Sequence, residues 1–192
     1  MRKIILSLSV SLDGYFEGPG GSLDWHLVDE ELHQHFNDQL RTMSAFLDGR
    51  VSHELMAAYW PTADANPEAS PAEAEFAGIW RDMPKYVFSR TLTKADWNAK
   101  VLRRVDREEI NALKAQPGGD MVIGGATIAD EFRRQGLIDA YHLYVMPVIL
   151  GAGRPLFPAS GVRTDLRLVE TRRFTNGVAL LRYEAGAGDS QG

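Results

Sequence analysis

The sequence contains no cysteine among its 192 residues. This absence excludes disulfide frameworks, iron–sulfur clusters, thiolate zinc sites and cysteine nucleophiles. No apolar run approaches the roughly 20 residues that a membrane helix needs, and the apolar stretch after Met1 is too short and interrupted for a signal peptide. We therefore expect a cytoplasmic protein that does not bind a membrane.

Basic residues are fewer than acidic ones, since the sequence has 21 Lys and Arg residues and 26 Asp and Glu residues. The basic residues form no stripe along the sequence, so the electrostatic footprint of a nucleic-acid-binding protein is missing and we expect no nucleic-acid partner. The 44% hydrophobic content is enough to fill one core. We predict a single domain over residues 1–185 and a flexible tail over 186–192, which carries no large apolar residue.

Strand and helix patterns alternate along the chain. An apolar strand at 2–10 leads into a glycine-rich turn at 13–21, and Leu32, Phe36 and Leu40 form one stripe of an amphipathic helix over 29–41. The stretch 62–71 reads as an irregular surface excursion. Further strands are predicted at 45–47, 85–89, 100–105, 121–123 and 138–150, further helices up to Tyr59 and at 72–81, 106–116 and 127–135, and a hairpin at 165–183. This order indicates an α/β fold with a mostly parallel central sheet, flanking helices and a C-terminal antiparallel hairpin.

Two strand-to-helix junctions carry glycine, at 47–52 and at 122–127. Free backbone N–H groups and the helix dipole can face an anion there without an intervening Cβ. Arg50 adds a planar guanidinium and Ser52 a hydroxyl. Either junction alone could equally be a capped turn, but two in one α/β chain favour phosphate binding. Neither matches G-x-G-x-x-G or G-x-x-x-x-G-K-[ST], so Rossmann and P-loop sites are not supported.

Ser89, Arg90 and Thr91 end the strand predicted at 85–89. Two hydroxyls and a guanidinium could hold a 2′-phosphate, although a solvated strand end would look the same. Together with Arg50, this group favours NADP over NAD, because the additional phosphate needs additional positive charge.

Taken in order, several stretches resemble the dihydrofolate-reductase-like superfamily over about residues 2–185. They are Ser11-Leu12-Asp13-Gly14-Tyr15-Phe16, Trp25, Asp48-Gly49-Arg50-Val51-Ser52, Tyr86-Val87-Phe88-Ser89-Arg90-Thr91-Leu92, Val122-Ile123-Gly124-Gly125-Ala126-Thr127 and Tyr141-His142-Leu143-Tyr144-Val145. The segment from Pro147 to Phe157 resembles the riboflavin-biosynthesis reductase branch and its stand-alone relatives, and it is unlike true dihydrofolate reductase.

The resemblance implies an NADPH-dependent reductase that transfers hydride to a small heterocyclic or C=N/C=O substrate. The candidate substrate is 5-amino-6-(5-phosphoribosylamino)uracil, and a homodimer is implied as well. The cofactor residues carried over are Leu8, Ser9, Asp13, Gly14, Gly49, Arg50, Ser52, Ser89, Arg90, Thr91, Gly124, Gly125, Ala126 and Thr127. The loop from Asp13 to Trp25 corresponds to the segment that closes over the nicotinamide.

The substrate side is less specific. In true dihydrofolate reductases an acid on the first helix binds the pterin; counting from Trp25 selects Glu30, whereas counting from Arg50 selects His33. Either could supply a proton as the catalytic residue, yet acids in a first helical turn also suit the helix dipole without any catalytic role. Trp25 and Arg154 are the substrate-binding candidates.

Two alternative functions stay open: a dihydrofolate or pterin reductase, and a non-catalytic NADP-binding module. Folate is disfavoured because Met83-Pro84-Lys85 stands where those reductases place an arginine for the carboxylate tail. His33 and His35 lie two positions apart and so point to different helix faces, which argues against a metal site.

Overall fold

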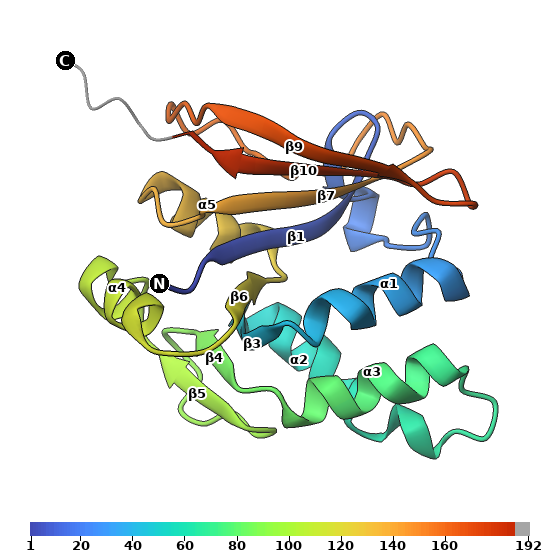
Figure 1. The fold of residues 1–192 in the computed structure, drawn as a ribbon, viewed down its shortest axis with the longest axis horizontal. Coiled ribbons are helices and arrows are strands. Elements are labelled where there is room, and N and C mark those ends of the chain that lie inside the picture. Colours follow the sequence, from blue (N-terminus) through green and yellow to red (C-terminus); the bar gives the residue numbers. More distant parts are fainter. Residues whose placement is uncertain (187–192) are drawn as a thin grey trace.

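The computed structural model describes residues 1–186, and the tail predicted over 186–192 therefore lies outside the described residues except for Gly186. Its main sheet has the order β5-β4-β3-β6-β1-β7-β10-β9. The strands are β1 (Ile4–Ser11), β3 (Met43–Gly49), β4 (Lys85–Phe88), β5 (Ala99–Leu102), β6 (Asp120–Ile123), β7 (Ala140–Met146), β9 (Leu166–Arg173) and β10 (Ala179–Ala185). Every pairing from β5 to β7 is parallel, whereas β10 is antiparallel to both β7 and β9. The predicted fold class is confirmed (Figure 1).

Helices cover both faces of the sheet. They are α1 (Glu30–Leu40), α2 (Arg50–Tyr59), α3 (Pro71–Asp82), α4 (Arg107–Ala115) and α5 (Ala126–Arg134). Leu47 and Ile123 pack with residues of α4 and α5, such as Phe132. Their strand neighbours Phe46 and Val122 pack instead with residues of α2 and α3. Alternate residues of one strand point to opposite faces, so α4 and α5 lie on one side of the sheet and α2 and α3 on the other.

On the side of α1, two separate apolar clusters flank strand β1. One lies over β7 and β10 and contains Tyr144 and Leu180; the other lies over β3 and β6 and contains Phe46 and Val122. The ends of β1 are buried, whereas Ser7, Leu8 and Ser9 in its middle are partly exposed. The central strand of the fold therefore presents small polar residues between two apolar walls.

Two sequence predictions need correction, and one feature was not predicted. The excursion 62–71 was expected to be irregular surface, but its start belongs to the 3₁₀ segment η2 (Trp60–Ala65), in which Pro61 and Ala63 are buried. Arg81 holds this segment by donating to the Pro61 carbonyl and to Asp64. The strand predicted to reach residue 150 ends at Met146. Beyond it, β8 (Arg154–Pro155) pairs with β2 (Tyr15–Glu17), in a small second sheet that the sequence did not predict.

Candidate cofactor and substrate site

The two glycine junctions meet at a reversal of the fold. Strands β3 and β6 are neighbours in the sheet, and α2 begins at the carboxyl end of β3 and α5 at that of β6. The two helices then run to opposite faces. In open α/β sheets, ligands bind outside the carboxyl ends of the strands at such a switch point.

The starts of α2 and α5 differ from those of the other α-helices within residues 1–186. Asp29 caps α1, Ser70 caps α3 in a reciprocal capping box with Glu73, and Asp106 caps α4. Helices α2 and α5 begin instead at Gly49 and Gly125, and no side chain caps either of them. Their first N–H groups and the positive ends of their dipoles are therefore available to an anion.

The turns pack against each other so closely that a side chain would fill the space between them. A Cβ built on Gly125 would lie 2.7 Å from the Ser52 hydroxyl oxygen, and one built on Gly124 would lie 3.4 Å from Oδ1 of Asp48. The structure thus brings together six of the residues expected at the cofactor phosphates: Gly49, Ser52, Gly124, Gly125, Ala126 and Thr127. We call this group the phosphate cradle. Its shape and its free donors fit phosphate oxygens.

Arginines lie around the cradle. Arg50, in the first turn of α2, is exposed and pairs with Glu54 at 2.7 Å. Arg90 is exposed at the end of β4. The Ser89 hydroxyl accepts the backbone N–H groups of Thr91 and Leu92 at 3.3 and 2.9 Å, so it shapes the turn that presents Arg90.

Sequence reasoning missed Arg103, which follows β5. Its guanidinium donates to the carbonyls of Arg90 and Leu92 at 3.1 and 2.9 Å and so clamps the same turn. No sequence signal could reveal this contact, because its acceptors are backbone carbonyls of a neighbouring strand end.

The loop after β1 is tied to the segment that follows β7. Asp13 accepts the N–H groups of Leu150 and Gly151 at 3.1 and 2.8 Å. The Ser11 hydroxyl also donates to Asp13 and, with these backbone donors, holds the pKa of its carboxyl group below the usual value. Gly14 adopts a φ of 87° in this turn. Asp13 therefore anchors the loop, and its predicted cofactor contact, like that of Gly14, stays a prediction.

Arg154 lies beside the cradle. Its guanidinium pairs with Glu17 at 2.8 Å, donates to the Thr127 hydroxyl at 3.1 Å and stacks on Phe16. Thr127 lies in the first turn of α5, so Arg154 is placed at the predicted pyrophosphate turn. Its assignment to the substrate stays a prediction.

Glu30 and His33, the two candidates for the catalytic proton donor, both lie on helix α1. Oε1 of Glu30 accepts the N–H of Ala72 in the first turn of α3, so this carboxylate stabilises a helix start. The His33 ring lies 5.8 Å from the ring of Trp60 and 5.7 Å from that of Phe76, and burial lowers its pKa. Trp25, the substrate-binding candidate nearby in the sequence, is partly buried. Its Nε1 donates to the Ser22 carbonyl, and its ring packs against the apolar cluster that contains Tyr144 and Leu180. The side chains of Glu30 and His33 both contact α3, and the catalytic role of either residue stays a prediction.

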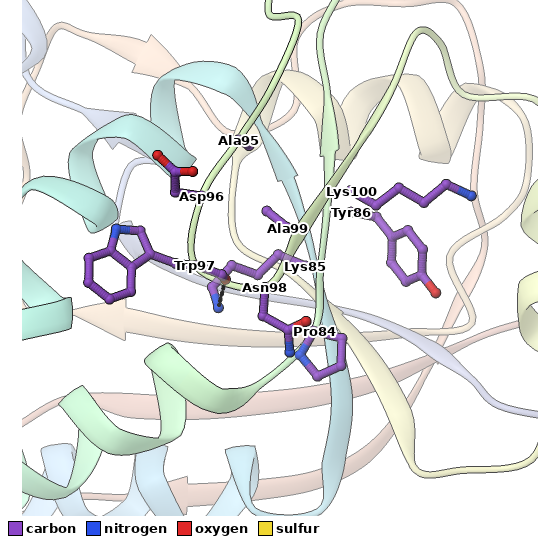
Figure 2. A pocket seen from close by; sticks show the side chains of 9 residues that line it. All are labelled: Pro84, Lys85, Tyr86, Ala95, Asp96, Trp97, Asn98, Ala99 and Lys100. Carbon is purple, nitrogen blue, oxygen red and sulfur yellow. Dashed lines mark hydrogen bonds between the residues drawn. The ribbon is translucent and has the colours of Figure 1, made fainter.

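A separate cavity lies away from the cradle. A cavity of about 470 Å³ lies at the start of β4 and the loop before β5, lined by residues such as Lys85, Trp97 and Asn98 (Figure 2). Phosphate-binding turns follow the other end of these strands. The Lys85 ammonium donates to the carbonyls of Trp80, Met83 and Trp97, which pins the end of α3 to the sheet. Lys85 is therefore structural, and it cannot replace the arginine that holds the folate tail.

Comparison with known proteins identifies the fold family. The pattern of the RibD C-terminal domain matches residues 2–180. The chain belongs to the RibD C-terminal domain family. This membership supports a reductase of the RibD family. No helix within residues 1–186 is long and apolar enough to cross a bilayer.

Individual relatives agree with this family. The protein is 38% identical to the uncharacterised protein YyaP of Bacillus subtilis, over 95% of this chain and 94% of that one. A putative riboflavin biosynthesis protein from Shewanella sp. PV-4 has the same fold, with a TM-score of 0.73, 20% identity and coverage of 97% and 99% of the two chains. A dihydrofolate reductase from Enterococcus faecalis, complexed with NADP(H), is similar with a TM-score of 0.58, 18% identity and coverage of 95% and 96%.

Proposed function

We propose that the protein is an NADPH-dependent reductase that transfers hydride to a small planar heterocycle or a C=N or C=O group. The observation that carries this proposal is the pair of uncapped glycine helix starts at neighbouring strand ends. Such a site suits the pyrophosphate of a dinucleotide, and Arg50 and Arg90 suit an additional 2′-phosphate. Family membership supports the reductase class.

When bound, NADPH supplies the hydride. The protein's contribution is to bind, orient and exclude water. In this proposal the cradle and the arginines around it hold the phosphates, and Leu8 and Ser9, which are partly exposed on β1, are assigned to the nicotinamide carboxamide by the resemblance. His33 is the candidate to deliver a proton opposite the hydride, and the loop that ends at Trp25 covers the site.

The substrate we favour is the RibD intermediate 5-amino-6-(5-phosphoribosylamino)uracil, on the strength of the family. A dihydrofolate or pterin reductase is the alternative, but Arg81, the nearest replacement for the arginine at the folate tail, is already bonded to Asp64 and Pro61. A non-catalytic NADP-binding module is a further alternative, and it predicts cofactor binding without turnover.

The test is a fluorescence titration with NADPH and with NADH, using energy transfer from tryptophan, on wild type and Arg50→Ala. Arg163→Ala is the control, because Arg163 is exposed and pairs only with Asp165 among the described residues. We expect tighter binding of NADPH than of NADH and a loss in Arg50→Ala alone. If neither nucleotide binds, the proposal fails. A panel of the uracil intermediate, dihydrofolate and dihydropterins, followed by NADPH absorbance, then separates the substrates.

We also propose that two copies of the chain associate through β9. This strand forms one edge of the sheet, all eight of its residues are exposed, and three of them are Leu166, Leu168 and Val169. A bulge opposite Arg182 makes this strand irregular. We therefore propose that the two copies pack face to face through β9 and do not join their sheets edge to edge. Light scattering should give a dimer for wild type and a monomer for Leu168→Glu; a wild-type monomer contradicts the proposal.

A further inference from the structure

Asp48 is a buried carboxyl group directly behind the phosphate cradle. It precedes Gly49 at the end of β3, is only 4% exposed, and its Oδ1 approaches the Cβ position of Gly124 to 3.4 Å. Within residues 1–186, burial and the charge of Lys85 are the influences on this carboxyl group, and no hydrogen bond is among them. Within the described part of the chain, no hydrogen bond explains an acid in this place, next to the proposed anion site.

The surrounding elements offer little to stabilise an ionised Asp48. Lys85 on β4 favours the charged form, but its ammonium is already held by three carbonyls. His53 on α2 is neutral, since burial lowers its pKa, and it stacks on Trp80. Arg50 and Glu54 on α2 pair with each other on the exposed side. The turn at Gly124 and Gly125 contributes no charged side chain, only the partial positive charge of the α5 start.

Burial therefore outweighs the attraction of Lys85 and raises the pKa of Asp48 to about 7. Burial also lowers the pKa of Lys85, to about 8, so Lys85 is mostly charged at neutral pH. Asp48 therefore takes up a proton at a much higher pH than an ordinary aspartate does.

We propose that Asp48 is a positioning residue of the phosphate cradle, that it must be neutral for the dinucleotide to bind, and that binding is coupled to uptake of one proton by its carboxyl group. This inference rests on the cofactor proposal above. Two anionic groups in one poorly solvated place repel strongly. The bound phosphates raise the proton affinity of Asp48 further, and the proton comes from solvent and leaves when the dinucleotide dissociates.

The coupling predicts the pH dependence of binding. The dissociation constant for NADPH should be constant just below pH 7 and should rise by up to about tenfold per pH unit above it, which is the slope for one linked proton. The 2′-phosphate of the ligand titrates near pH 6 on its own. Comparing variants with wild type between pH 6.5 and 9 removes this contribution, because the ligand is the same.

The first experiment needs no variant. Calorimetric titration of wild type with NADPH at pH 7.5, in two buffers of different ionisation enthalpy, counts the protons taken up; we expect a net uptake approaching one. In the free protein, carbon NMR of the labelled aspartate carboxyls should show one group titrating near neutral pH. Binding without proton uptake overturns the inference alone, whereas the absence of binding at any pH overturns the cofactor proposal as well.

Asp48→Asn keeps the size of the side chain and removes its ionisation. We expect it to abolish the proton uptake and to bind NADPH equally well at pH 7 and pH 9. The matched control is Glu108→Gln, an exposed acid on α4, which should behave as wild type. An unchanged pH slope in Asp48→Asn, or uniformly weaker binding with the slope retained, would contradict the role. Circular dichroism verifies that the variant is folded.

Discussion

Helix starts in this protein fall into two groups. Helices α1, α3 and α4 begin with Asp29, Ser70 and Asp106, each of which satisfies backbone N–H groups with its own side chain. Helices α2 and α5 begin at glycine and leave these groups without a side-chain partner. A side-chain cap stabilises a helix by about 1 kcal/mol. Helices α2 and α5 lack this contribution, and both of them begin at the phosphate cradle. This difference is what the proposed cofactor site requires, because an anionic ligand would bind at the two open starts.

The largest effect is expected when a side chain fills the space between the two turns of the phosphate cradle. Gly125→Val should weaken NADPH binding by roughly 100-fold, the size of effect that a displacement of about 1 Å can cause, because even a Cβ would come within 2.7 Å of the Ser52 hydroxyl oxygen. Fluorescence titration measures it. The control is Gly78→Ala in α3, where the added Cβ meets nothing closer than 3.9 Å. Unchanged binding in Gly125→Val would refute the cradle.

A second comparison sets His33 against Glu30. Replacing His33 by Gln should lower kcat by about 100-fold with little change in KM, as expected for loss of a proton donor. Burial lowers the pKa of His33 below its ordinary value, so the protonated form is lost, and kcat should fall, as pH rises through a pKa lower than 6.5.

Glu30→Gln is the matched variant, because Glu30 supports the first turn of α3 through the Ala72 N–H. We expect a lower melting temperature and wild-type kcat. Equal kcat in both variants would remove the assignment of His33 as a proton donor. Both are measured by steady-state kinetics on the substrate that the panel identifies.

Variants of Arg90 and Arg103 distinguish binding of the 2′-phosphate, which only NADPH carries, from binding of the pyrophosphate, which NADPH and NADH share. Arg90→Ala should weaken NADPH by about tenfold, the effect of losing one exposed charge-assisted contact, and leave NADH unchanged. Arg103→Ala should weaken NADPH by a smaller factor, because it only clamps the turn that presents Arg90. Arg104→Ala serves as the control, since this exposed residue pairs with Asp106. A parallel loss of NADH affinity would place Arg90 at a different part of the ligand.

The smallest effect concerns the capped helices. Asp106→Ala should lower the free energy of unfolding by about 1 kcal/mol, because two N–H groups of α4 lose their acceptor. NADPH affinity should not change. Urea unfolding measures the first quantity and fluorescence titration the second. A weaker affinity would mean that capped and uncapped helix starts do not differ in function.

Much of this site could be predicted from local sequence. Short-range patterns suffice to predict the glycine junctions at Gly49 and Gly124, because each spans only a few residues. The same holds for the apolar stripe of the first helix. His53 shows the limit. This residue of α2 is only 4% exposed, and it stacks on Trp80 of α3, which is itself fully buried. The contact joins residues of two helices, so no local pattern reveals it.

By itself, the sequence determined the order of the elements, the family and the glycines at the two helix starts, because propensity, periodicity and turn chemistry act over a few residues. Only the tertiary structure decided that Glu30 and His33 both contact α3, that Arg103 clamps the Arg90 turn, that Arg154 stands beside Thr127, and that Asp48 is buried behind the cradle. Each of these depends on contacts between residues far apart in the chain, and burial and pairing, which set the charge and the availability of a side chain, exist only once those residues have met.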